Sequence, residues 1–151
     1  MREWVMTRFA NSHSDIGVPI SRANDHRLVG RGERMRAKRI TANLRVPDIE
    51  ATKSFYTDYL GLRDEEFNMG WVARYTDPDT GVNLQFVTGD ATAGEDSVIS
   101  VHTDDVEGAY EEARQRGYEI VHPLTTEPWG VRRFFVRAPD GNVLNVVYHR
   151  D

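Results

Sequence analysis

The amino-acid sequence contains the same pattern twice, and the two copies lie 57 to 60 positions apart. Segment 46–49 corresponds to segment 103–106 at an offset of 57, and segment 83–85 corresponds to segment 143–145 at an offset of 60. An internal repeat of this kind indicates two similar structural units in one chain. Any fold proposed for the chain must therefore accommodate two copies of one plan.

The first copy has the pattern of a strand, a helix and two further strands. Residues 40–46 alternate between apolar and polar side chains, which is typical of a half-buried strand. Asp48 can cap a helix with its side-chain oxygen, and Gly61 suits the left-handed residue that ends one. Strands are predicted at 71–76 and 82–87.

The second copy follows the same order, with one more strand after the helix. A strand is predicted at 98–102, and a helix capped by Asp104 or Asp105 ends at Gly117. Further strands are predicted at 119–121, 132–136 and 143–148. The fold class is therefore α+β, with two tandem βαβββ modules at residues 40–90 and 97–149.

Residues 1–39 have a different composition from the rest of the chain. They lack a sustained apolar period, and their nine Arg or Lys and four Asp or Glu give a net charge of +5. Residues 40–151 carry ten Arg or Lys and twenty Asp or Glu, a net charge of −10. We expect a flexible basic extension before an acidic folded domain. An acidic domain disfavours nucleic acid and favours cationic partners.

The sequence also excludes several classes of protein. The absence of cysteine excludes disulfides, zinc sites built on thiolates and thiol catalysis. No apolar run approaches the roughly 20 residues of a membrane helix, and residues 1–10 lack the apolar core of a secretory signal. We therefore expect a cytoplasmic protein without a membrane partner.

Several motifs resemble a known family. Segment 45–49, the pair Phe55-Tyr56 and segment 59–62 resemble the opening unit of the glyoxalase, bleomycin-resistance and extradiol-dioxygenase (vicinal oxygen chelate) superfamily. The turn at 139–142 resembles its closing turn, although Ala138 replaces the usual Asp. The resemblance covers residues 40–149. It implies paired modules whose curved sheet encloses a cleft, and chains that commonly form a homodimer.

Enzymes of this superfamily usually bind one divalent metal through inward-facing strand residues. The matching positions in this sequence are Thr41, Gln85, Val98 and Asn145. A hydroxyl, two neutral amides and an apolar side chain include no carboxylate or imidazole for a divalent ion. We therefore expect no metal and no other cofactor.

The strand alternation predicts a polar face opposite the helices. An antiparallel sheet with one solvated face shows the same pattern, so plain solvent exposure is one interpretation. Neutral amides, however, suit a pocket that orients a polar ligand by hydrogen bonds, and Trp129 in a loop-like segment can add an apolar wall. The predicted ligand-binding residues are Asn43, Arg45, Gln85, His102, Trp129 and Asn145.

Three functions remain open. The first is a metal-independent small-molecule binding protein of the bleomycin-resistance type, which sequesters a polar or cationic metabolite or drug in a dimer cleft. The second is a metal-independent isomerase, cyclase or lyase with His102 as its acid–base group. The third is an interaction module that uses the basic extension. We interpret the acidic segments 64–66 and 104–105 as a solvated loop and a helix cap.

Overall fold

Eight strands form one sheet in residues 34–150, the part of the chain that the computed structural model describes. The strand order is β2-β3-β4-β1-β5-β8-β7-β6. The first module comprises β1 (Arg39–Arg45), α1 (Ile49–Ser54), the π-helical turn η1 (Phe55–Tyr59), β2 (Asp64–Asn68), β3 (Val72–Thr76) and β4 (Asn83–Val87). The second comprises β5 (Ile99–His102), α2 (Val106–Gln115), β6 (Ile120–Thr126), β7 (Arg132–Arg137) and β8 (Val143–Tyr148).

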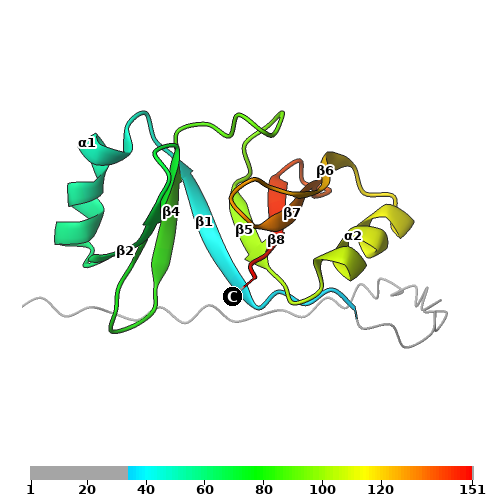
Figure 1. Ribbon diagram of the computed structural model, residues 1–151, viewed down its shortest axis with the longest axis horizontal. Helices are drawn as coiled ribbons and strands as arrows, with labels where there is room; N and C mark the ends of the chain where they lie inside the picture. Colours follow the sequence, from blue (N-terminus) through cyan, green and yellow to red (C-terminus); the bar gives the residue numbers. More distant parts are fainter. Residues whose placement is uncertain (1–33, 151) are drawn as a thin grey trace, which may run out of the picture. The chain divides into compact units, whose positions relative to one another are not determined.

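The two modules have the same strand pairing, as the internal repeat predicted. In the first, β1 pairs in parallel with β4 and places Asn43 opposite Gln85. In the second, β5 pairs in parallel with β8 and places Ser100 opposite Asn145. The antiparallel pair β1–β5 then joins the modules into one curved sheet, with β1 and β5 at its centre (Figure 1). The predicted α+β fold is confirmed.

Each helix begins and ends where the sequence predicted. The Asp48 carboxylate accepts a hydrogen bond of 2.9 Å from the backbone N–H of Ala51, and the Asp105 carboxylate accepts one of 2.8 Å from Gly108. Gly61 and Gly117 have φ angles of 77° and 74°, the left-handed conformation that favours glycine. Among residues 34–150, no helix is long and apolar enough to cross a membrane.

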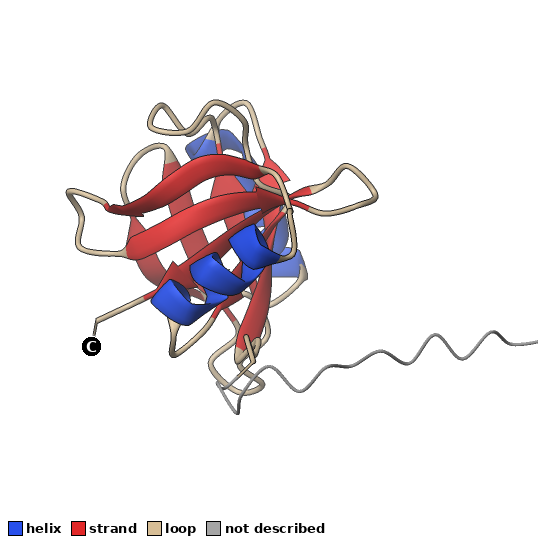
Figure 2. Ribbon diagram, turned by 90° about the vertical axis from the view of Figure 1, so that its right-hand side faces the viewer, coloured by secondary structure: helices blue, strands red, loops and turns tan. Residues whose placement is uncertain are grey.

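Each module has its own apolar core between its helix and its part of the sheet. Phe86 of β4, which is fully buried, lies at the centre of the first core, and its ring contacts those of Tyr56 and Tyr75. Phe134 of β7 takes this place in the second core, where its ring contacts that of Tyr110 on α2. Figure 2 shows α2 lying across the strands of the second module. The opposite face of the sheet is therefore left to polar side chains, in line with the alternation of the strands.

Segment 64–66, which we predicted to be a solvated loop, is part of strand β2, so this prediction was wrong. β2 is an edge strand, and its acidic residues occupy exposed positions. Such a strand does not need apolar residues at alternate positions. Glu65 accepts a hydrogen bond of 2.5 Å from the Tyr75 hydroxyl, and Glu66 forms an ion pair of 3.2 Å with Arg74. The acidic residues therefore attach β2 to β3.

The described chain contacts the second module before the predicted domain start at residue 40. Met35 packs against the core under α2, and its backbone N–H donates a hydrogen bond of 2.8 Å to Glu112. The backbone N–H of Lys38 donates one of 2.7 Å to the His102 carbonyl. Residues 1–33 of the predicted extension lie outside the described residues.

Replacing Phe86 by Ala should lower the free energy of unfolding by about 3–5 kcal/mol, because the substitution leaves a cavity in a closed core. Denaturant unfolding measures this loss. The matched control is Phe55→Ala on η1, where the side chain is 56% exposed and a loss of about 1 kcal/mol or less is expected. Equal losses for the two variants would contradict this description of the core.

Candidate functional site

A cavity of about 240 Å³ lies between the two modules. The first module contributes Phe67, Arg74 and Gln85 to its lining, and the second contributes Ser100, Trp129 and Asn145. Gln85 lies between Leu84 and Phe86, which both belong to the core under α1, so the cavity is on the sheet face away from the helices. We refer to this cavity as the cleft.

Four side chains form a hydrogen-bonded group, the amide network, across the junction of the modules. Gln85 donates to Asn43 (3.1 Å), and Asn43 donates to the Ser100 hydroxyl (3.1 Å). Asn145 donates to the same hydroxyl at 3.0 Å. Gln85, Ser100 and Asn145 are buried, so these bonds give the cleft an ordered polar base.

Arg74 fixes the direction of the amide network. Its Nη2 donates a hydrogen bond of 3.0 Å to Gln85 Oε1. Because a guanidinium can only donate, Gln85 must present its oxygen to Arg74 and its amide N–H groups to Asn43. Arg74 is only 4% exposed, and its Cζ lies 4.9 Å from the centroid of the Phe67 ring. Arg74 was not among the predicted ligand-binding residues, although it lies on β3 opposite Gln85, on the sheet face that strand alternation gives.

Two tryptophans meet where equivalent turns of the modules approach each other. Trp71 precedes β3 and Trp129 precedes β7, and their ring centroids are 5.4 Å apart at an interplanar angle of 67°. This edge-to-face contact is a favourable geometry for aromatic pairs. The contact therefore holds Trp129, which lines the cleft, in a defined position.

Arg133 is a second buried arginine that the sequence analysis did not include. It forms ion pairs of 2.7 Å with Asp90 and 2.8 Å with Glu127, and donates a hydrogen bond of 2.7 Å to Thr92. Burial raises the pKa of Asp90, but hydrogen bonds from Arg133 and Thr92 hold it below its usual range overall. Arg133 thus ties the segment between the modules to β7, and two carboxylates more than offset its single positive charge.

His102 lies beside the cleft, in an adjoining hollow that shares Phe67, Arg74 and Val147 with it. The His102 and His149 rings are stacked with centroids 4.9 Å apart, and Nε2 of His102 lies 3.5 Å from Nη2 of Arg39. Burial, followed by the positive charges of Arg39 and Arg74, lowers the pKa of His102 to about 3. His102 is therefore neutral at neutral pH.

Most of the predicted ligand-binding residues lie together, and one does not. Gln85, Trp129 and Asn145 line the cleft, Asn43 accepts a hydrogen bond from Gln85, and His102 borders the adjoining hollow. Arg45 ends β1 beyond the cleft, where its exposed side chain forms an ion pair with Asp96. Strand alternation gives the sheet face on which Arg45 lies, but not how far along β1 it lies from the cleft.

The side chains at the superfamily's usual metal positions do not fit a divalent ion. Gln85 and Asn145 are engaged in the amide network, and Thr41 donates a hydrogen bond of 2.8 Å to Asn83. Val98 has no donor atom in its side chain and is 45% exposed. Within residues 34–150, no group of three or more His, Asp or Glu side chains is placed to hold a metal ion.

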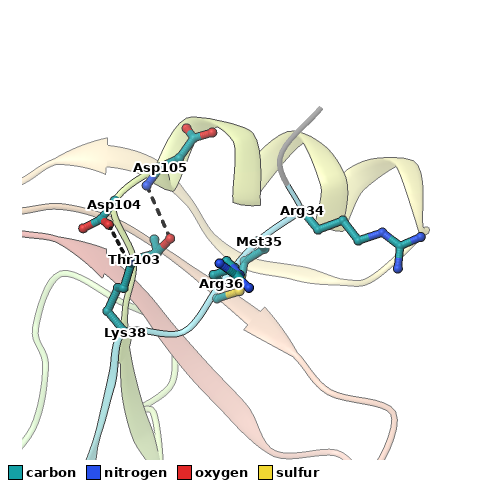
Figure 3. A pocket seen from close by; sticks show the side chains of 7 residues that line it. All are labelled: Arg34, Met35, Arg36, Lys38, Thr103, Asp104 and Asp105. Carbon is teal, nitrogen blue, oxygen red and sulfur yellow. Dashed lines mark hydrogen bonds and ion pairs between the residues drawn. The ribbon is translucent and has the colours of Figure 1, made fainter. Parts of the chain in front are cut away.

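A separate hollow lies beside the first turn of α2 (Figure 3). Its acidic side chains already have structural roles, since Asp104 forms an ion pair of 3.0 Å with Lys38 and Asp105 caps α2. The Thr103 hydroxyl accepts a hydrogen bond of 3.3 Å from the Asp105 backbone N–H. This hollow therefore contains no pair of carboxylates arranged for acid–base chemistry.

Solved structures with related folds come from several organisms. A crystal structure described as an NAD-dependent benzaldehyde dehydrogenase from Legionella pneumophila has a TM-score of 0.60 and 16% identity, and covers 74% of this chain and 100% of its own. A glyoxalase/bleomycin resistance protein/dioxygenase superfamily member from Vibrio splendidus 12B01 has a TM-score of 0.57 and 20% identity, with coverage of 73% and 97%. At these identities the likeness concerns the fold.

Sequence comparison gives the family. The uncharacterized protein YwbC of Bacillus subtilis (strain 168) is 28% identical over 117 residues, which cover 70% of this chain and 93% of that protein. The sequence model of the Glyoxalase/Bleomycin resistance protein/Dioxygenase superfamily matches residues 38–146. This match spans both modules, with all strands up to most of β8. The chain therefore belongs to the Glyoxalase/Bleomycin resistance protein/Dioxygenase superfamily.

Proposed function

We propose that this protein binds a small molecule in the cleft without the help of a metal ion. The observation that carries the proposal is the buried amide network at the base of a cavity with aromatic walls. Ligand sites typically combine apolar walls with a few well-placed polar groups. The volume of about 240 Å³ lies below the usual range of roughly 300–1,000 Å³ for drug-sized ligands. A small metabolite therefore fits the cleft better than a large antibiotic.

Metal independence is part of the proposal and rests on the chemistry of the side chains. A divalent ion would have to displace the hydrogen bonds within the amide network and would receive no anionic ligand in return. The homodimer, the cytoplasmic location and a resistance role stay predictions, and so does the interaction module, which depends mainly on residues 1–33.

The alternative of a metal-independent isomerase, cyclase or lyase is supported less well. It requires a general base whose pKa lies near the working pH. A pKa of about 3 makes His102 a weak base at neutral pH. Binding without chemistry is therefore the function that the site supports best.

Protein purified without chelator should contain less than about a tenth of an equivalent of any divalent metal, because the site offers no anionic ligand. Elemental analysis measures the content, and a chelator should leave the melting temperature unchanged. Near one equivalent of tightly held metal would contradict metal independence.

At least one of three small planar probes, benzoate, benzamide and benzamidine, should bind with a millimolar or tighter dissociation constant. Trp129→Ala should weaken this binding about tenfold, because a wall of the cleft is lost. Tyr118→Ala is the control, since this aromatic residue is exposed beyond the end of α2. Calorimetric titration measures the constants, and the absence of binding by all three probes would contradict the proposed function.

His102 should make the protein less stable as the pH falls from 7 to 5. In this window the unfolded chain protonates a histidine of ordinary pKa, about 6.5, whereas the folded chain keeps His102 neutral. Protonation thus favours unfolding, and stability rises with pH. The melting temperature of His102→Gln should fall less than that of the wild type over the same window. Identical slopes would show that the pKa of His102 is not depressed.

A further inference from the structure

One end of the cleft carries an excess of positive charge. The hollow that adjoins the cleft at Arg74 is lined by four basic side chains, those of Lys38, Arg39, Arg74 and Arg150, and by two acidic ones, those of Glu66 and Asp104. Lys38 pairs with Asp104 at 3.0 Å and Arg74 with Glu66 at 3.2 Å. Within the described part of the chain, no carboxylate lies in ion-pair contact with Arg39 or Arg150 in this hollow.

Arg74 is the buried member of this group and lines both the hollow and the cleft. Its Nη1 and Nη2 have partners in Glu66 and Gln85, but its buried Nε–H has none among the described residues. A buried donor without a partner is unfavourable, because it has lost its hydrogen bonds to water. The Glu66 carboxylate, which also accepts a hydrogen bond of 2.5 Å from Thr76, is the ion-pair partner of Arg74, so the excess charge of the hollow comes from Arg39 and Arg150.

The charges around Arg133 offset this excess only in part, because one arginine with two carboxylates leaves a single negative charge against the two uncompensated positive charges of the hollow. Asp90 and Glu127, the buried carboxylates near Trp129, both form ion pairs with Arg133. The acidic balance of the whole domain, which led us to expect a polar or cationic ligand, is therefore carried by side chains elsewhere. The local charge at the cleft favours a ligand of the opposite sign.

We propose that the ligand is a small organic anion with a planar apolar body. Its anionic group would lie against Arg74 and Arg39, beside the neutral His102, and its body would lie between Phe67 and Trp129. This inference rests on the proposed small-molecule function and specifies the ligand class. Arginine suits the role because its planar guanidinium recognises carboxylates and stacks on aromatic rings.

The three planar probes test the inference because they share a ring and differ in charge. Benzoate is anionic, benzamide is neutral and benzamidine is cationic at neutral pH. Benzoate should bind about 10- to 100-fold more tightly than benzamide, the difference expected for hydrogen bonds to a charged group. Benzamidine should bind most weakly. Calorimetric titration of the full chain at constant salt measures all three.

Arg74→Gln should reduce benzoate binding to the level of benzamide and leave benzamide binding largely unchanged. Because Arg74 also orients Gln85, a second variant separates charge from folding. Arg39→Gln changes an exposed side chain and should weaken benzoate binding severalfold. The benzoate affinity of this variant should also depend less on salt concentration than that of the wild type. Arg45→Gln is the matched control on the same strand, and it should change nothing.

The outcomes distinguish the two proposals. Equal binding of the three probes, tighter binding of benzamidine, or benzoate binding that neither Arg74→Gln nor Arg39→Gln weakens would overturn the anionic ligand and leave the small-molecule function intact. No binding of any probe would overturn both.

Discussion

The structure depends on the antiparallel pairing of β1 with β5. This pairing places Thr41 opposite Ser100 and joins the two modules through main-chain hydrogen bonds. It also brings Asn43, which accepts a hydrogen bond from Gln85 of its own module, into contact with Ser100 of the other module. A shift of one residue in this register would turn the polar side chains of one strand toward its helix. The same register is therefore required by both the amide network and the apolar core.

Much of the fold could be predicted from the sequence because it depends on local rules. The caps at Asp48 and Asp105, and the left-handed Gly61 and Gly117, each follow from one residue and its neighbours. The repeat then supported the elements of one module by their counterparts in the other. β2 was missed because an edge strand with exposed carboxylates has no apolar period to detect.

The candidate site was harder to predict than the fold. Alternation gave the sheet face of Gln85 and Asn145, but the two buried arginines were absent from the prediction, since arginine is usually exposed. Their burial depends on specific polar partners in other segments, which alternation within one strand does not identify: Arg133 needs Asp90 and Glu127, and Arg74 needs Gln85. Net charge is a poor guide to the ligand for the same reason, because it does not record which carboxylates are already paired.

The difference between Arg74 and its counterpart has a consequence for selectivity. Arg74 lies opposite Gln85, and the equivalent position opposite Asn145 is held by Phe135. A cleft built from two identical modules would accept a ligand equally well in either of two orientations related by the repeat. Arg74 lines the cleft, whereas Phe135 is buried beneath Arg133, so the two orientations would differ in energy. The repeat symmetry of the backbone is thus not matched by the side chains, and a molecule bound as we propose would prefer one of the two orientations.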